Sequence, residues 1–522
     1  MGKKLGMFIA LMILAFGVLS ACSGDSSSEG DKGGNERKTK DTFIYGIEGD
    51  PGNSVNVITT NDRYGLTVVK TVYSPLYKYN GPDDLTYYLA ESFEPSEDFL
   101  TYTAKLRKDV KWHDGEAFTA DDVVFTFEQM LDEKNGGSAY GQLQFNGKPL
   151  KVEKVDDHTV VFTLPSVSMS AIEALSSIFI MPEHIYKGET NIANSKKNAA
   201  PVGTGPYKLK EYKAGESVSF ERNEDYFLGK PEIKNIVYRI IPDANTATVA
   251  LQKGEIDALA IAPADVAKFE GNENISIKPY DEDRVGYMAF NLSSENTPDK
   301  EIRKVLLTAL NKDEIIKASY LSEDYAQPAY SILPKRAAYY TDELEKYDFD
   351  QDAATEALKG QKLKLRLAYI SNNAFMQKQA AVIQQNWKAV GVDVELVGMD
   401  ATAMYNKLAE KHSDFELFLN GYIMGNDPDQ YQSLYVSDSF SNYSHYANPK
   451  VDELFNKGQV QPDEAARQQI YEEVQQTIAD DAFFYPITEN KRILAINSSI
   501  EVPEDNLVAI YTFEDLSKLS IK

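Results

Sequence analysis

Two aspartates in the stretch LNGYIMGNDPDQY, Leu419 to Tyr431, combine a residue type and a spacing that can do chemistry. Asp427 and Asp429 flank Pro428 and follow an almost unbroken apolar run. Such carboxylates can form a catalytic acid pair, bind a metal or anchor a charged ligand, and aspartates beside proline also favour turns. Acid catalysis needs a raised pKa on one carboxyl and a second group across the substrate, and adjacency in the sequence supplies neither. The turn and the ligand anchor both stay open for these residues.

Other catalytic and metal-binding patterns are missing from the sequence. It contains no G-x-S-x-G elbow, no P-loop and no H-E-x-x-H motif. The stretch 348–359 begins like a calcium loop, but Ala353 stands where the loop needs glycine and Lys359 where it needs glutamate, so it is interpreted as a capped helix start. The histidines are scattered without ligand spacing: His113, His158, His184, His412 and His445. We expect no enzyme activity, no cofactor and no metal.

The N-terminus has the pattern of an export signal. Lys3 and Lys4 precede an apolar stretch, 7–19, which is shorter than the roughly 20 residues of a membrane helix. LSAC, ending at Cys22, resembles the lipobox of bacterial lipoproteins, which implies lipidation of that cysteine and anchoring to the outer face of a cell membrane, in a bacterium of Gram-positive type. Residues 22–40 lack large apolar side chains and are expected to form a flexible tether.

Length and charge limit the architecture and the partners. A chain of 522 residues is longer than one core usually supports, so two or three lobes are expected. The net charge of −26 would repel a phosphate backbone, so we expect no nucleic-acid partner. After the signal, no apolar segment is long and uncharged enough to span a bilayer, so contact with the membrane is expected through the lipid only.

Hydrophobic periodicity predicts an α/β chain. A strand is expected at 42–48, a strand-turn-strand at 102–118 followed by a helix capped at Thr119, a strand at 159–164 and a hairpin within 201–223. Farther along, a strand at 363–369, a helix over Met376–Val390 and a strand at 392–397 form a βαβ unit. The run 415–425 is so continuously apolar that it fits a strand covered on both faces. Ligands of such sheets bind beyond the carboxyl ends of the strands, which is where Asp427 and Asp429 lie.

With these segments in place, the chain resembles the extracytoplasmic substrate-binding proteins of ABC importers, in the family shared by oligopeptide-, dipeptide- and nickel-binding proteins. The most specific block is LAESFEPSEDFLTYTAKLRKDVKWHDGEAFTADDVVFTFE, 89–128. Further blocks follow in the family's order: MPEHIY (181–186), PVGTGPYKL (201–209), ERNEDYF (221–227), LQKGEIDAL (251–259), IRKVLLTALNKDEII (302–316), DPD (427–429) and NPKVDELF (448–455). Together they cover nearly the whole mature chain.

The resemblance implies a fold class and a division into domains. The fold would be two α/β lobes of the type II periplasmic-binding-protein kind, joined by a hinge, with an additional β-rich domain. The implied domains are a signal peptide (1–21), a tether (22–40), lobe I (41–80, 200–287 and 486–522), the extra domain (81–199) and lobe II (288–485).

The resemblance also implies a peptide site. An extended peptide would pair through its main chain, as an added strand, with residues that need not read its side chains. In this sequence these residues are Asn420, Gly421 and Tyr422, together with Thr60, Asn61, Asp62, Arg63 and Tyr64. Tyr422, Tyr431 and Tyr435 would line the cleft or pack with satisfied hydroxyls.

One position departs from the family's pattern. Many relatives hold the α-amino group of the ligand with an aspartate four residues before the proline, and Met424 stands there in this chain. Burying an ammonium without a charged partner costs several kcal/mol. Either Asp427 or Asp429 substitutes for the missing acid, or the protein does not clamp a free N-terminus and admits longer peptides in several registers. We favour the second hypothesis, because a flexible methionine makes an adaptable pocket wall.

The expected partners are an oligopeptide ligand and ABC permease subunits, and the expected state is a monomer. An oligosaccharide ligand is a weaker hypothesis, since stacking on sugars favours exposed tryptophan and the chain has only Trp112 and Trp387. A nickel chelate and a peptide-sensing role are the remaining alternatives.

Overall fold

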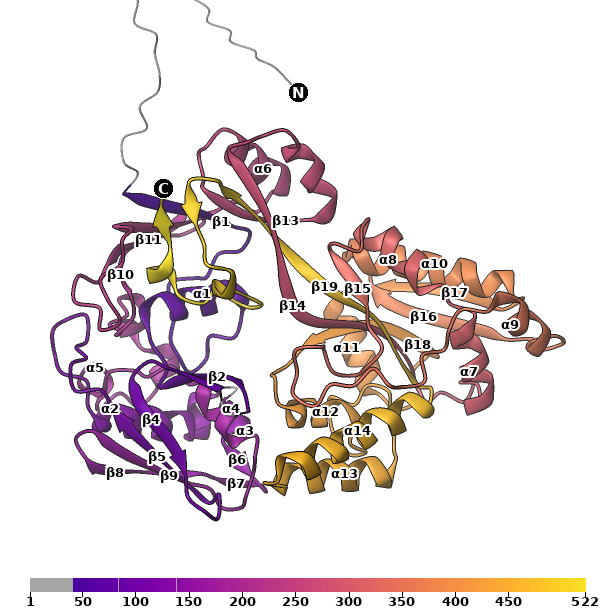
Figure 1. Cartoon of the computed structure of the whole chain (residues 1–522), viewed down its shortest axis with the longest axis horizontal. Coiled ribbons are helices and arrows are strands. Elements are labelled where there is room, and N and C mark those ends of the chain that lie inside the picture. The colour runs from indigo at the N-terminus through magenta and orange to yellow at the C-terminus, as the bar shows by residue number, and fades with distance from the viewer. Residues whose placement is uncertain (1–40, 83, 138) are drawn as a thin grey trace, which may run out of the picture. The chain divides into compact units, whose positions relative to one another are not determined.

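The computed structural model describes residues 41–82, 84–137 and 139–522 (Figure 1). The signal peptide, Cys22 and the tether therefore lie outside the described residues. Within the described part, no helix combines the length and the apolar character needed to cross a membrane. Residues 41–522 form a single unit.

A mixed sheet of eleven strands runs through this unit. β1 pairs in parallel with β12 and β13, and β16 pairs in parallel with β17 and β18. In sheet order the strands are β10 (Tyr207–Lys213), β11 (Ser217–Arg222), β12 (Asn235–Ile240), β1 (Thr42–Ile47), β13 (Ala258–Ile261), β19 (Phe484–Asn497), β14 (Ile275–Phe290), β18 (Leu417–Ile423), β16 (Lys364–Ile370) and β17 (Asp393–Met399), with β15 (Ala326–Pro328) beside β19.

Two long antiparallel strands, β14 and β19, connect the two halves of the protein (Figure 1). The apolar interior is divided into two main cores: Tyr280 of β14 packs in the first core and Val285 in the second. Between these residues the ladder with β19 is irregular, at Asp281–Arg284. β19 makes the same passage, from Ile487 in the second core to Leu494 in the first. The two segments that pass from one core to the other lie where a hinge between two lobes is expected.

The predicted extra domain contains a four-stranded antiparallel sheet that shares the first core. Its helix α2 begins with the predicted capping box, because Thr119 and Asp122 satisfy each other's backbone N–H groups. The predicted strand at 159–164, the first strand of 102–118 and the helix are confirmed. The second strand predicted within 102–118 is wrong, because that stretch forms only an isolated bridge between Lys111 and Ala117. The elements are β4 (Ala90–Pro95), β5 (Thr101–Leu106), β8 (Lys151–Asp156), β9 (Thr159–Thr163) and α2 (Ala120–Met130), with the hairpin β2 (Tyr77–Gly81) and β3 (Asp84–Tyr87) beside them.

The second half confirms the predicted βαβ unit. Helix α10 (Ala374–Ala389) connects the parallel strands β16 and β17. Trp387 of α10 is fully buried and donates its indole N–H to the Leu306 carbonyl at 2.7 Å. The predicted capped helix near 350 is α9 (Gln351–Ala357), which Asp350 caps.

The remaining α-helices of the described residues complete the two halves. They are α1 (Arg63–Val72), α3 (Ala139–Gln142), α4 (Ala171–Ser176), α5 (Glu183–Tyr186), α6 (Ala244–Gln252), α7 (Lys300–Thr308), α8 (Lys312–Tyr320), α11 (Ala401–Ala409), α12 (Gln432–Tyr435), α13 (Pro449–Val460) and α14 (Glu464–Asp480). Short strands are β6 (Gln144–Phe145), β7 (Lys148–Pro149), β20 (Ile500–Glu501), β21 (Leu507–Val508), β22 (Thr512–Phe513) and β23 (Ser520–Ile521).

Candidate ligand-binding cavity

A cavity of about 450 Å³ lies beside the segments of β14 and β19 that pass from one core to the other. Residues of both halves line it. Glu48 follows β1 and Pro263 follows β13 on one side, and Asn373 follows β16 while Ile423 ends β18 on the other. The cavity therefore lies at the carboxyl ends of parallel strands, where open α/β sheets bind their ligands. Its volume falls in the range of small-molecule pockets.

Strand β18 has an edge that faces no other strand over part of its length. β14 pairs with all of Leu417–Ile423, but β16 pairs only with Leu417 and Phe418. Beyond Phe418, the second edge of β18 has no strand partner among the described residues. Asn420 lines the cavity at this edge, and its Oδ1 accepts from the Gly421 N–H at 2.9 Å and from the Tyr405 hydroxyl at 3.1 Å.

Arg63 is the residue of the segment Thr60–Tyr64 that lines the cavity. It donates to Glu282 of β14 at 2.9 Å and to the Ala509 carbonyl at 2.7 Å. The structure thus brings Arg63 and Asn420, which are distant in sequence, to one cavity.

The other residues of this segment have local roles. Asp62 caps α1 by accepting from the backbone N–H groups of Tyr64 and Gly65. Thr60 Oγ1 accepts from the Asn56 N–H at 3.1 Å, and Asn61 is exposed. The Tyr64 hydroxyl donates to Glu48 at 3.4 Å.

Asp427 and Asp429 are buried around one arginine of α14. Arg467 forms a bidentate pair with Asp427, at 2.7 and 2.8 Å, and lies 3.4 Å from Asp429 Oδ2. Tyr471, one turn along α14, donates its hydroxyl to Asp429. Asp427 also accepts from the Asp429 N–H at 2.9 Å, so its predicted turn role is confirmed. Burial and the neighbouring Asp427 raise the pKa of Asp429 to about 7.

The turn that holds these aspartates also contacts the extra domain. Glu173 of α4 accepts from the backbone N–H groups of Asn426 and Asp427 at 2.7 and 2.8 Å. Burial raises the pKa of Glu173 to about 7, although the two N–H donors favour its charged form. Gly425 lets the carboxylate approach, since a Cβ there would lie 2.6 Å from it. Glu173 and Asp427 thereby join the first half of the protein to the second.

The two partners of the Asp427 turn, Arg467 and Glu173, were not predicted from the sequence. A signal for Arg467 was present, because Arg467, Tyr471, Val474 and Ile478 lie at helical spacing on the buried face of α14. A cation in such a stripe indicates a buried acidic partner. The segment around Glu173 carries no comparable pattern.

The predicted tyrosines belong to the second core, and neither they nor Met424 line this cavity. Tyr422 donates its hydroxyl to the Ile332 carbonyl and lies 2.9 Å from the Tyr435 hydroxyl. Tyr431 donates to the Gly425 carbonyl at 3.0 Å. Met424 is partly buried against the second core. The ligand contacts expected of Tyr422, Tyr431, Met424 and the other site residues stay predictions.

A second cavity, of about 420 Å³, lies between the extra domain and α14. Tyr79 of β2, Phe93 of β4 and Tyr102 of β5 line it on one side, and Tyr339 and Arg467 line it from the second half. Because Asp427 neutralises Arg467, the walls of this cavity suit apolar groups.

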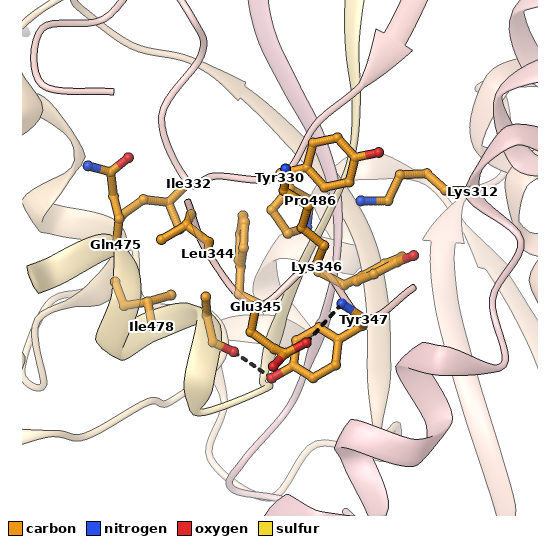
Figure 2. Close-up of a pocket in the computed structure, with 13 residues that line it drawn as sticks. Lys312, Tyr330, Ile332, Leu344, Glu345, Lys346, Tyr347, Gln475, Ile478 and Pro486 are labelled. Carbon is orange, nitrogen blue, oxygen red and sulfur yellow. Dashed lines mark hydrogen bonds between the residues drawn. The ribbon is translucent and has the colours of Figure 1, made fainter. Parts of the chain in front are cut away.

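A third pocket lies around Tyr330 and Tyr347 (Figure 2). Its volume of about 10 Å³ holds at most one water molecule, so it is not a ligand site. Lys312 at its edge donates to the Ala329 carbonyl at 2.6 Å and lies between the rings of Tyr330 and Tyr485. Burial lowers the pKa of Lys312 to about 7.

The described residues offer no support for metal chemistry. They contain no group of three or more His, Cys, Asp or Glu side chains placed to hold a metal ion. His113 is a structural residue, because its ring accepts from the Gly203 N–H and contacts the Gly205 carbonyl. Both tryptophans are buried, at 2% exposure for Trp112 and 0% for Trp387.

An α/β protein with two cores, two connecting strands and a ligand-sized cavity between them has the architecture of the two-lobed binding proteins that close around a solute. Residues 84–444 match the bacterial extracellular solute-binding proteins, family 5. The chain belongs to this family of ABC transporter solute-binding proteins, so it is an extracellular, non-enzymatic protein.

Three relatives illustrate the family. The oligopeptide-binding protein AppA of Bacillus subtilis is 30% identical over 92% of this chain and 93% of its own length. The structure of the ABC transporter substrate-binding protein CtaP of Listeria monocytogenes superposes with a TM-score of 0.89, at 43% identity over 93% of this chain and all of that one. The structure of NikZ of Campylobacter jejuni, with Ni(L-His), has a TM-score of 0.73 at 27% identity, over 89% and 95% of the two chains. These likenesses confirm the predicted mixed α/β, two-lobed fold.

Proposed function

We propose that this protein captures oligopeptides outside the cell and delivers them to an ABC importer. The observation that carries the proposal is the edge of β18 beyond Phe418, which faces the cavity without a strand partner among the described residues. A peptide laid along Asn420, Gly421 and Tyr422 would add a strand to the sheet and be recognised through its main chain. The structure of Bacillus subtilis AppA with a nonapeptide supports this choice of ligand.

The Asn420 side chain prepares this edge for a ligand. Its Oδ1 accepts from the Gly421 N–H, as a peptide carbonyl would. A ligand carbonyl can replace this bond when Asn420 rotates, so binding need not leave the N–H unpaired. The same edge accepts peptides of different sequence, because side chains do not enter these bonds.

The anchor and the transport partners belong to the same proposal. Cys22, lipidated after removal of residues 1–21, would hold the protein at the outer face of a Gram-positive cell membrane through acyl chains. The tether 22–40 would let the lobes reach the permease subunits. We propose that the protein acts as a monomer.

Other solutes fit the described residues less well. No tryptophan is available to stack on a sugar, because Trp112 and Trp387 are both buried. No cluster of metal ligands exists among the described residues, although a chelate could carry its own ligands. A peptide-sensing role uses the same site and differs only in the partner.

Native mass spectrometry of the protein purified from its own cells tests the proposal. We expect additional masses that correspond to peptides of mixed sequence, released on denaturation and identified by fragmentation. A carbohydrate or a metal chelate as the bound species would contradict the choice of ligand.

A further inference from the structure

The cavity of about 420 Å³ beside α14 has an aromatic lining that the proposed peptide site does not use. The aromatic residues that line it are Tyr79, Tyr87, Phe93, Phe99, Tyr102 and Tyr339. Phe93 and Tyr102 stack in its wall, with ring centroids 5.5 Å apart. No described residue lines both this cavity and the cavity at the free edge of β18. A ligand beside α14 would therefore occupy a site of its own.

Two of these aromatic residues have a left-handed backbone. The angle φ is 56° at Phe99, which lies between β4 and β5, and 60° at Tyr339 in the second half. Bulky residues rarely adopt this conformation, because their Cβ meets the backbone, and the surrounding structure must offset the strain. Strained residues of this kind concentrate at ligand sites. One such ring on each side of the same cavity is the first indication of a ligand.

Two tyrosines add hydroxyl groups that the described residues leave unpaired. Tyr79 and Tyr102 are 6% and 2% exposed, yet neither hydroxyl has a hydrogen-bond partner in the described part of the chain. Burial, and next the Asp427 carboxylate on the other wall of the cavity, raise the pKa of Tyr79. Buried tyrosine hydroxyls usually find a partner, so these two offer hydrogen bonds to a ligand.

The charged side chains of the lining disfavour an anion. Two acids, Asp427 and Glu464, stand against one cation, Arg467. Arg467 forms its bidentate pair with Asp427 at 2.7 and 2.8 Å, so it has no free charge to offer a carboxylate. The rings present apolar faces and edges that favour packing with another aromatic ring. The lining thus suits an uncharged, flat ligand with a hydrogen-bonding group.

We propose that this cavity is a second binding site, which takes a small uncharged aromatic molecule with a hydroxyl or N–H group, such as a phenol or an indole. The ring of the ligand packs against Phe99 and Tyr339, and its polar group forms a hydrogen bond with the hydroxyl of Tyr79 or Tyr102. The volume of about 420 Å³ is in the range of small-molecule pockets. The site goes beyond the proposed function, because it does not depend on which solute the other cavity holds.

Isothermal titration calorimetry of the purified protein with indole and 4-methylphenol tests the inference. We expect each probe to bind saturably, at one site per chain. An anion of similar size, 4-hydroxybenzoate, and cyclohexanol, which lacks an aromatic ring, should each bind at least about tenfold more weakly. Equal binding of the anion or of the saturated ring would overturn the proposed ligand chemistry. Absence of saturable binding of both probes would overturn the site.

Variants place the binding in this cavity. Phe99→Asn removes a lining ring, and asparagine tolerates the left-handed backbone, so the variant should fold and bind indole at least about tenfold more weakly. The double variant Tyr79→Phe/Tyr102→Phe keeps both rings and should weaken the binding of 4-methylphenol at least about threefold. Phe440→Asn removes a ring that is 87% exposed and does not line the cavity, so this matched control should bind as the wild type does.

The two cavity variants fail in different ways. Unchanged affinity of Phe99→Asn for indole would overturn the site, and unchanged affinity of the double variant for 4-methylphenol would overturn the hydrogen bond assigned to the tyrosines. Either result leaves the proposed peptide site standing, because these residues do not line it.

Discussion

At the scale of single residues, the contacts of Asp427 and Asp429 show that both aspartates are structural. They are not a catalytic pair, because Arg467 and Tyr471 occupy their oxygens in the interior. The turn preference of aspartate beside proline predicted the role of Asp427, since this preference is local. Arg467 lies 40 residues farther along the chain, and local patterns do not indicate which acid a distant cation meets.

Removing the cation tests this arrangement. Arg467→Met should lower the free energy of unfolding by about 3–5 kcal/mol, because it leaves two buried carboxylates without a counter-ion. Urea unfolding followed by the fluorescence of the buried Trp112 and Trp387 measures the change. Arg239→Met, at a partly exposed arginine, should change stability by less than about 1 kcal/mol. If Arg467→Met lowers the free energy of unfolding by as little as Arg239→Met does, Arg467 is not the counter-ion that stabilises the buried aspartates.

At the scale of elements, local periodicity predicted the βαβ unit, the capped helices α2 and α9 and the buried strand β18. It did not predict β14 and β19, the longest strands. Charged residues at Asp281–Arg284 interrupt the alternation of β14, at the point where its ladder with β19 is irregular. The pairing of Ile275 with Asn497 joins segments far apart in sequence, and three cations of the cavity, Arg284, Lys491 and Arg492, lie on these two strands. This part of the site was therefore beyond prediction from local patterns.

The contact between α4 and the Asp427 turn should make stability depend on pH. The pKa of Glu173 is about 7 in the folded protein, above its ordinary value of 4.5. Below about pH 4.5 the group is protonated in both the folded and the unfolded state, and its contribution to the free energy of unfolding is then most favourable. As the pH rises toward 7, the unfolded chain releases the proton first, so the wild type loses up to about 3 kcal/mol relative to Glu173→Gln, and the difference is constant above pH 7.

Urea unfolding of both proteins between pH 4.5 and 8 measures this dependence. Glu453→Gln, at an exposed acid paired with Lys457 on α13, is the matched control and should show no such slope. If the free energies of unfolding of the wild type and Glu173→Gln differ by the same amount at every pH, the raised pKa of Glu173 is contradicted.

At the scale of the whole molecule, the residues from 41 onward build two main cores with a cavity between them. β14 and β19 run from one core to the other. Cavities between two lobes suit proteins that close around a ligand, and family membership agrees with that use. The domain boundaries inferred from the sequence stay predictions. The two core crossings, at 281–284 on β14 and between Ile487 and Leu494 on β19, are where we expect the lobes to hinge.

A crystal structure of the protein purified with its natural ligand tests the central claim most directly. The account predicts an extended polypeptide in the cavity, with main-chain hydrogen bonds to Asn420–Tyr422 and side-chain density averaged over several sequences. An occupant that is not a polypeptide, or a peptide whose main chain makes no hydrogen bond to that edge of β18, would contradict it.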